Sequence, residues 1–243
     1  MRPWTISDQS IEGLRSVGFT DLEIFHAILG CAHFNYLNRM ADGLGIRLEY
    51  ASALRAPDLA PERAIDDPVP DAARPLAAFL RVPSTVLPTT SREPASLIAA
   101  LGANPDAQAL TLEWHRYHLR PTDDLGEPLR LRAALLAARL AGCEYLSDLY
   151  RRRLEVLSQA PGALEKGHVP EDLGRRERAI LHHVARLSLA PGSIVEQEVE
   201  ELRAVGCSDV TIVRLTMLAA YVSYESRVSL GLGIPVSPAE GAP

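Results

Sequence analysis

The chain has 243 residues, of which 47% are hydrophobic and 23% are charged, and its formal net charge is −6. It is long enough to bury a substantial core, and its excess of acidic residues disfavours a nucleic-acid partner, because binding to phosphates depends on Lys and Arg. The chain contains no apolar window of about eighteen residues that would predict a membrane span. It also contains no apolar run near the N-terminus that would predict a secretory signal. We therefore expect a cytoplasmic protein with neither a nucleic acid nor a membrane as partner.

The chain contains three cysteines, Cys31, Cys143 and Cys207. They are too few and too scattered to form a disulfide framework, and an odd number leaves at least one thiol free. This pattern is typical of a protein in a reducing compartment.

A segment at the N-terminus recurs at the C-terminus. Residues 3–46 and 191–234 align without a gap and share about 17 identical residues, which indicates an internal duplication. In the first copy, Ser7 and Thr20 are placed to cap two successive helices, and Gly18 provides the left-handed turn between them. Each copy therefore predicts a pair of helices.

The second helix of each copy carries apolar residues at near-helical spacing. We expect this helix over about residues 21–44 in the first copy. A two-fold pairing of residues 1–48 with residues 191–236 would bury both apolar faces. Arg39 and Arg227 lie late in the two long helices, where a cation complements the helix C-terminus and bonds its last carbonyl groups, so we expect a structural role for both.

The composition changes between the two copies. Residues 51–105 hold nine of the 18 prolines, so we predict a connector without long helices. Short helices are compatible with residues 71–80 and 94–101. Helical periodicity returns at Asp106, and helices are predicted over residues 107–119, 129–141, 144–159 and 174–189, before the helix pair of the second copy.

No segment shows the alternating pattern of a strand. The predicted fold class is therefore all-α, a bundle of five or six helices preceded by a detached helix pair. The predicted organisation is a helix pair in residues 1–50, a Pro-rich connector in 51–105, a helical domain in 106–236 and a tail in 237–243.

The string Leu-Arg-Leu-Arg-Ala-Ala-Leu-Leu-Ala-Ala-Arg-Leu-Ala-Gly-Cys-Glu-Tyr-Leu at residues 129–146 is the most distinctive part of the helical domain. With residues 177–181 and the Leu-Arg-x-x-Gly-x-x-Asp end of each repeat, it resembles the carboxymuconolactone decarboxylase and AhpD-like alkylhydroperoxidase family. The resemblance covers about residues 106–236. It implies an AhpD-like helical bundle, with residues 1–48 as the closing helix pair of a second, truncated unit.

The resemblance also implies what peroxidase activity requires. Family members with that activity carry Cys-x-x-Cys at a helix start, histidines around the second cysteine and a glutamate one helix earlier. This chain keeps the first cysteine as Cys143, whereas the other positions hold Leu131, Tyr145, Leu146 and Tyr150. These side chains do not relay protons near neutral pH, so the mechanism with two cysteines in one chain is excluded.

Two functions follow from the resemblance. In the first, Cys143 is the catalytic residue of a thiol-dependent peroxidase, an antioxidant oxidoreductase, and an external thiol reductant completes the cycle. In the second, the protein is an inactive family member that serves as a helical oligomerisation module or binds a small molecule. Its pocket would then be lined by the residues at the substituted positions, namely Leu131, Tyr145, Leu146 and Tyr150. Because family members assemble through helical faces, we expect a homo-oligomer.

A third function, decarboxylation of a lactone acid, requires a proton donor and a cation that binds the carboxylate. Arg132, Arg139 and Arg151 are candidates for that cation. Residues 151–153 are three consecutive arginines, which predict a solvated helix face that is able to bind an anion. No motif indicates a cofactor, and His115 and His118 lack a third ligand at a defining spacing, so no metal site is predicted.

Overall fold

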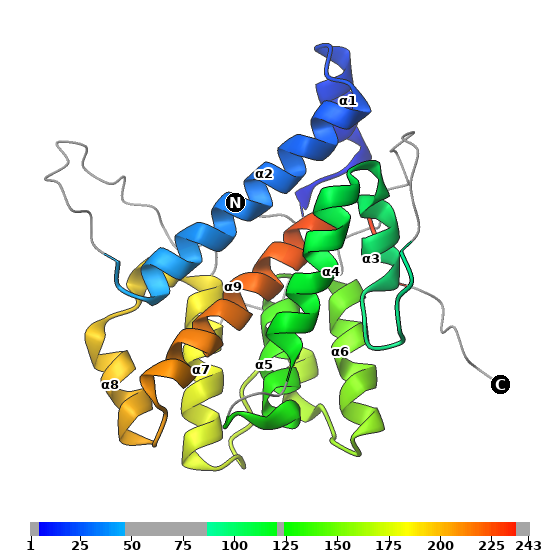
Figure 1. Cartoon of the computed structure of the whole chain (residues 1–243). Coiled ribbons are helices and arrows are strands. Elements are labelled where there is room, and N and C mark those ends of the chain that lie inside the picture. Colours follow the sequence, from blue (N-terminus) through cyan, green and yellow to red (C-terminus); the bar gives the residue numbers. More distant parts are fainter. Residues whose placement is uncertain (1–4, 47–86, 121–123, 237–243) are drawn as a thin grey trace, which may run out of the picture.

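The computed structural model describes residues 5–46, 87–120 and 124–236 (Figure 1). Within these ranges every regular element is a helix and no strand occurs, which confirms the all-α fold class. The predicted short helix at 71–80 and the tail lie outside the described residues, as does most of the connector. The α-helices are α1 (Asp8–Ser16), α2 (Asp21–Gly43), α3 (Ala95–Ala100), α4 (Pro105–Leu119), α5 (Gly126–Leu140), α6 (Glu144–Val156), α7 (Arg175–Leu189), α8 (Glu196–Ala204) and α9 (Asp209–Gly231).

The duplicated helix pairs begin and end as the sequence predicts. Ser7 accepts a hydrogen bond from the backbone N–H of Ser10 at the start of α1, and Thr20 caps α2 in the same way. Gly18 joins the two helices with a φ of 99°, and Gly206 joins α8 and α9 with a φ of 85°. Both angles lie in the left-handed region that only glycine adopts without strain, so the turn explains why both copies keep glycine.

The helices of the middle segment agree with the predicted ranges to within two residues, except at the end of α6, which stops at Val156 and not at residue 159, and at the start of α5. This helix begins at Gly126 and includes Pro128, which we expected to lie in a gap between helices. Proline is accepted there because the N–H groups of a first helical turn have no partner within the helix. A helix therefore starts before a proline that sequence patterns treat as a stop.

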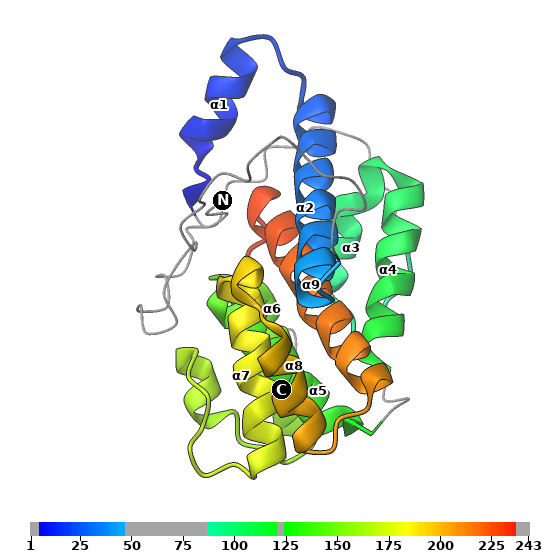
Figure 2. The same cartoon turned by 90° about the vertical axis from the view of Figure 1, so that its left-hand side faces the viewer.

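Helix α5 lies at the centre of the bundle and packs against α6, α7 and α9. Helix α2 packs along α9 on the other side, and α1 projects from the N-terminal part of α2 (Figures 1 and 2). Phe25 and Ala32 of α2 are buried in the same core as α9, so the first helix pair is not detached as predicted. Only α1 extends away, and it contacts α2 through Ile11 and Ile24.

The contact between α2 and α9 is symmetric. Gly43 of α2 lies so close to Thr216 of α9 that an added Cβ would be 2.6 Å from its Cγ2 atom. Gly231 of α9 lies in the same way against Ile28 of α2, where an added Cβ would be 2.7 Å from Cγ2. Gly43 matches Gly231 in the repeat, and Ile28 matches Thr216. The two copies therefore make reciprocal contacts about a two-fold axis within one chain, in the manner of a symmetric dimer interface.

Arg39 and Arg227 are buried in this region, at 2% and 6% exposure. Arg39 donates a hydrogen bond to the carbonyl of Ser188, at 3.0 Å, in the last turn of α7. The expected structural role is thus present, but the carbonyl belongs to a neighbouring helix and not to the end of α2. Arg227 donates to the side chain of Ser223 one turn earlier in α9.

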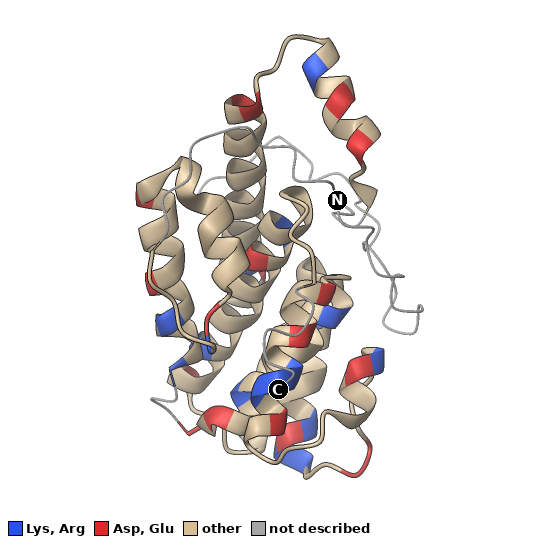
Figure 3. Cartoon of the chain, turned by 90° about the vertical axis from the view of Figure 1, so that its right-hand side faces the viewer, with Lys and Arg blue, Asp and Glu red and all other residues tan. Residues whose placement is uncertain are grey.

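Charged residues are unevenly distributed over the helices. They are frequent on α1, α6, α7 and α8, whereas the middle of α2 has none (Figure 3). In the part of the chain that the structure describes, no helix combines the length and apolar character needed to cross a bilayer.

Candidate functional site

A cluster of polar side chains lies in the core between α4, α6 and α9. Its centre is Glu225, in the C-terminal half of α9, whose side chain is 0% exposed. The hydroxyl of Tyr221 donates to its Oε1 atom at 2.7 Å, and the hydroxyl of Tyr150 donates to its Oε2 atom at 2.9 Å. His115 Nδ1 lies 3.0 Å from Oε1. These contacts compensate the cost of burying a carboxyl group, which is several kcal/mol when the group has no partner.

Helix geometry brings these groups together. Tyr221 and Glu225 are four residues apart and share one face of α9, and Thr111 and His115 share one face of α4. The hydroxyl of Tyr221 also lies 3.1 Å from the carbonyl of Thr111, which ties the two helices together. Tyr150 reaches the cluster from α6. The cluster therefore joins three helices.

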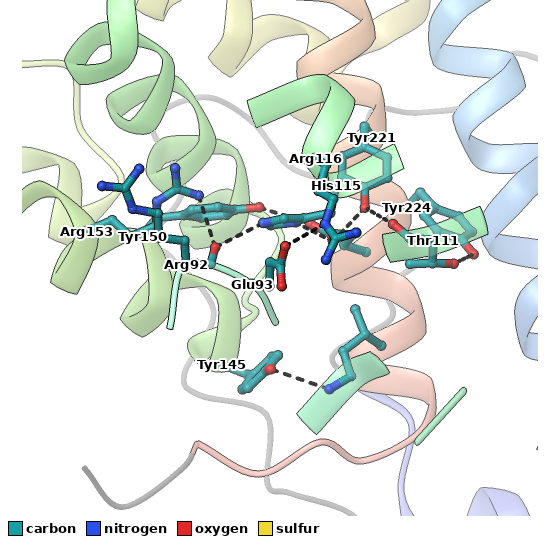
Figure 4. Close-up of polar contacts among 12 residues, drawn as sticks. Arg92, Glu93, Thr111, His115, Arg116, Tyr145, Tyr150, Arg153, Tyr221 and Tyr224 are labelled. Carbon is teal, nitrogen blue, oxygen red and sulfur yellow. Dashed lines mark hydrogen bonds and ion pairs between the residues drawn. The ribbon is translucent and has the colours of Figure 1, made fainter. Parts of the chain in front are cut away.

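His115 connects the cluster to a short segment that precedes α3. Its Nε2 atom lies 3.2 Å from the backbone carbonyl of Arg92 (Figure 4). A carbonyl only accepts hydrogen bonds, so Nε2 carries a hydrogen and donates it. Arg153 Nη1 donates to the same carbonyl, also at 3.2 Å. One peptide oxygen thus receives two donors, one from the buried cluster and one from α6.

Burial alters the acidity of the tyrosines. It raises the pKa of Tyr150 and of Tyr221 well above the ordinary value, and the nearby charge of Glu225 acts in the same direction. Both hydroxyls therefore remain protonated donors at neutral pH. Burial also raises the pKa of Tyr145 to about 12.

A cavity of about 480 Å³ lies on the other side of the Arg92 carbonyl, between the segment before α3 and the outer face of α6. Tyr145 and three arginines border it, together with an apolar wall. The arginines are Arg92, Arg152 and Arg153, and the apolar wall consists of Leu149, Val156 and Leu157. Glu93 and Glu127 also border it, and each pairs with an arginine. The cavity thus combines charged and apolar surfaces, as sites for small organic ligands do.

The three arginines differ in their environment. Arg153 is only 10% exposed and pairs with Glu127, at 3.2 Å. Its Nε atom is buried and has no hydrogen-bond partner among the described residues. Arg152 pairs with Asp148 at 2.8 Å and is partly exposed, whereas the side chain of Arg92 is exposed. Arg153 is therefore the least exposed of the three arginines that border the cavity.

Glu93 anchors the segment before α3 onto α4. Arg116 Nε donates to its carboxylate at 2.7 Å, and the backbone N–H of Thr90 donates at 2.7 Å. Burial alone would raise the pKa of Glu93, but these two hydrogen bonds outweigh it and hold the pKa below the ordinary value. The carboxylate is therefore charged at neutral pH and holds the Arg92 carbonyl in position.

Cys143 occupies the expected place, directly before the first residue of α6, but it is 1% exposed. Burial raises the pKa of its thiol to about 12, and the backbone N–H of Leu146 offsets only part of this effect. The thiolate, which is the reactive form, is therefore scarce at neutral pH. Proximity to the helix N-terminus does not overcome burial here.

The four residues that stand at the substituted family positions lie in different surroundings in the structure. Leu131 and Leu146 are fully buried in the core and are not among the residues that border the cavity beside α6. Tyr150 is also fully buried, but its hydroxyl contacts Glu225. Tyr145 is the member of this set that borders the cavity. The rest of the lining comes from later residues of α6 and its C-cap, from residues 89–96 and from Glu127.

The three arginines considered as cations for a carboxylate lie away from the cavity. Arg132 pairs with Glu177 and Arg139 with Glu144, and neither borders the cavity. Arg151 pairs with Asp148 and Glu155 and does not border the cavity. Its neighbours Arg152 and Arg153 border the cavity instead, because successive residues of a helix point about 100° apart.

No sequence motif singled out Glu225 or Tyr221, and the spacing of His115 suggested only a candidate metal ligand. A signal was present in the repeat, where Glu225 is matched by Leu37 and Tyr221 by His33. An acidic residue that stands alone in an apolar helix, and that replaces a leucine of the other copy, indicates a specific role. No group of three His, Cys, Asp or Glu side chains among the described residues is arranged to hold a metal ion.

A comparison with models of known protein families gave no match, and searches for similar curated proteins and similar solved structures also gave none.

Proposed function

We propose that this chain is an AhpD-like helical protein, of the carboxymuconolactone decarboxylase kind, that binds a small organic anion in the cavity beside α6. The resemblance of residues 129–146 to that family supports the assignment. The single observation that carries the binding function is the convergence of Arg92, Arg152 and Arg153 on one cavity with an apolar wall. Guanidinium groups bind carboxylates through paired hydrogen bonds, and the apolar wall accommodates the carbon skeleton.

The environment of Cys143 favours this function over a thiol-dependent peroxidase. An external thiol reductant and a peroxide both need access to the sulfur atom, and Cys143 is buried. A thiol with a pKa of about 12 is also almost fully protonated at pH 7. As part of the proposal, the three free cysteines are consistent with a cytoplasmic location.

Homo-oligomerisation is a second part of the proposal. Phe34 of α2 is 67% exposed and Leu37 is 44% exposed, on a stretch of α2 without charges. Apolar side chains that are grouped on a surface are typical of protein contacts. The proposed oligomer is independent of the anion site, because α2 does not border that cavity.

The test of anion binding is calorimetric titration of the full chain with a series of mono- and dicarboxylates of increasing length. Arg153→Gln removes the most buried guanidinium, and Arg151→Gln is the matched control, because Arg151 lies on the same helix but outside the cavity. We expect saturable binding that Arg153→Gln weakens at least tenfold and that Arg151→Gln leaves unchanged. Absence of saturable binding by every carboxylate, or equal effects of both variants, would overturn the proposal.

A further inference from the structure

The carbonyl oxygen of Arg92 occupies an unusual position between the buried cluster and the cavity. It receives hydrogen bonds from His115 Nε2 and from Arg153 Nη1, each at 3.2 Å (Figure 4). Two converging donors, one of them a cation, form the kind of site that stabilises negative charge on a carbonyl oxygen. The protein fills this site with its own peptide group.

The His115–Glu225 pair is able to supply a proton at this site. Because Nε2 donates to a carbonyl, one further proton is shared between His115 Nδ1 and Glu225 Oε1, which are 3.0 Å apart. Tyr150 and Tyr221 donate to the two carboxyl oxygens of Glu225 and fix its orientation. When Nε2 gives up its proton, the shared proton moves fully to Nδ1 and the imidazole stays neutral. Glu225 then carries the remaining negative charge.

We propose that a ligand with a carbonyl group replaces the Arg92 carbonyl between His115 and Arg153, and that His115 then acts as a general acid on the ligand oxygen. The inference rests on the proposed anion site and names its ligand class as small oxo-carboxylic acids. The ligand carboxylate binds Arg152 or Arg92, and the ligand carbonyl takes the two donors that the peptide oxygen releases. In this arrangement His115 is the catalytic residue, and Glu225 is a positioning residue.

The reaction that such a site promotes is enolisation. C3 of the 2-oxo acid, the carbon next to the ketone carbonyl, loses a proton to a water molecule. The electron pair of that C–H bond forms the C=C bond of the enol. The carbonyl oxygen takes the Nε2 proton of His115, and the proton shared with Glu225 passes to Nδ1. The reverse sequence returns a solvent proton to carbon and restores the pair. In deuterium oxide each cycle therefore replaces a C3 hydrogen of the ligand with deuterium.

The segment that carries Arg92 is held by contacts that a ligand is able to exchange. Arg153 donates to the Arg92 carbonyl, and a ligand oxygen offers the same guanidinium an equivalent acceptor. Glu93 remains tied to Arg116 on α4, so the segment keeps an anchor one residue away. In the proposal the peptide between Arg92 and Glu93 rotates locally, which also releases the hydrogen bond that the Glu93 N–H donates to the Thr90 carbonyl at 2.9 Å.

The experiment follows exchange of the C3 hydrogens of 2-oxo acids in deuterium oxide by proton NMR. It compares the wild-type full chain with His115→Gln, Arg153→Gln and the control Arg151→Gln. We expect wild type and Arg151→Gln to accelerate exchange at least tenfold over buffer, and the other two variants to lose this acceleration. Exchange at the buffer rate with a 2-oxo acid that binds by calorimetry would overturn the inference and leave the anion site intact. Absence of binding as well would overturn both.

A second measurement guards against a His115 variant that fails to fold. In wild-type protein labelled with ¹⁵N, the Nε2–H signal of His115 should shift when a 2-oxo acid is added. It should stay in place when the corresponding acid without the 2-oxo group is added. Glu225→Gln should retain this signal and change the pH profile of exchange, which a merely structural residue would not do. A His115 signal that no oxo acid moves would contradict the replacement of the Arg92 carbonyl.

Discussion

Asn35 of α2 and Ser223 of α9 hold the same position in the two copies of the repeat, and their side chains meet. The hydroxyl of Ser223 donates to Asn35 Oδ1 at 3.4 Å, between residues that are 188 apart in the chain. Arg39 donates to Asn35, and its counterpart Arg227 donates to Ser223. Two equivalent residues contact one another only on a symmetry axis, so the axis of the duplicated unit passes through this pair.

Outside the axis, the copies also keep the same ion pair. Arg15 Nε donates to Asp21 at 2.8 Å, and Arg203 Nε donates to Asp209 at 2.8 Å, in each case across the turn between the two helices. The duplicated unit is therefore a helix pair whose turn keeps the same ion pair in both copies, and α2 and α9 pack as two subunits of a dimer would.

The first prediction concerns the close approach at this axis. Gly231→Ala places a Cβ atom 2.7 Å from Ile28 Cγ2, so we expect a loss of about 1–3 kcal/mol in the free energy of unfolding. Gly30→Ala is the control, because Gly30 is helical and an added Cβ meets nothing within 4 Å. It should stabilise by about 0.5–1 kcal/mol through helix propensity. Urea denaturation measures both, and equal effects would contradict close packing at Gly231.

The second prediction concerns thiol reactivity. Cys31 is exposed, whereas Cys143 and Cys207 are buried, so a thiol reagent should modify Cys31 in the native protein and the other two only after unfolding. Cys143→Ser should leave any peroxide consumption with dithiothreitol at the wild-type level. Cys31→Ser is the control, and it should abolish the rapid native reaction. Rapid native labelling of Cys143 would restore the peroxidase hypothesis.

The third prediction concerns the buried cluster. Tyr150→Phe removes the donor to Glu225 Oε2 and leaves a buried carboxyl oxygen without it, which should cost about 1–3 kcal/mol in the free energy of unfolding. Tyr117→Phe removes an exposed hydroxyl and should change stability by less than about 0.5 kcal/mol. Chemical denaturation of the two variants at pH 7 makes the comparison. A neutral Tyr150→Phe would show that the hydroxyl does not stabilise Glu225.

The fourth prediction concerns pH. Burial lowers the pKa of His183 to about 4, below the ordinary value of 6.5, and neither ring nitrogen has a hydrogen-bond partner among the described residues. Between these pH values the unfolded chain binds a proton that the folded chain does not, so stability falls as the pH decreases from about 6.5 to 4.

Replacement of His183 tests this linkage. His183→Leu should reduce the slope of the unfolding free energy against pH in this window by up to about 1.4 kcal/mol per pH unit. His118, whose pKa burial also lowers to about 4, is unchanged in the variant and should maintain part of the slope. Denaturation curves at pH 5 and pH 7 are sufficient. Parallel profiles for variant and wild type would mean that His183 is protonated in the folded protein.

The fifth prediction concerns assembly. Phe34→Glu places a charge on the exposed apolar stretch of α2, and we expect it to shift sedimentation of the protein from oligomer to monomer. Val156→Glu is the control, because Val156 is also a highly exposed apolar residue but lies on α6. A wild-type protein that is monomeric at all concentrations would exclude the oligomer.

The sequence alone determined the helical elements, because capping, turn and periodicity signals act within one or two helical turns. Thr20, Gly18 and the apolar spacing of α2 are such local signals, and they sufficed to predict the helix pair and its duplication. Even the two-fold contact between the copies was expected, since each apolar face required a partner.

Tertiary structure alone decided the candidate site. His115 and Glu225 are 110 residues apart, and Tyr150 is 75 residues from Glu225, so no local pattern joins them. Their meeting depends on how α4, α6 and α9 cross in the core. The same packing buries Cys143. The desolvation that a surrounding core imposes on a thiol does not depend on its neighbours in sequence, so no local pattern predicts it.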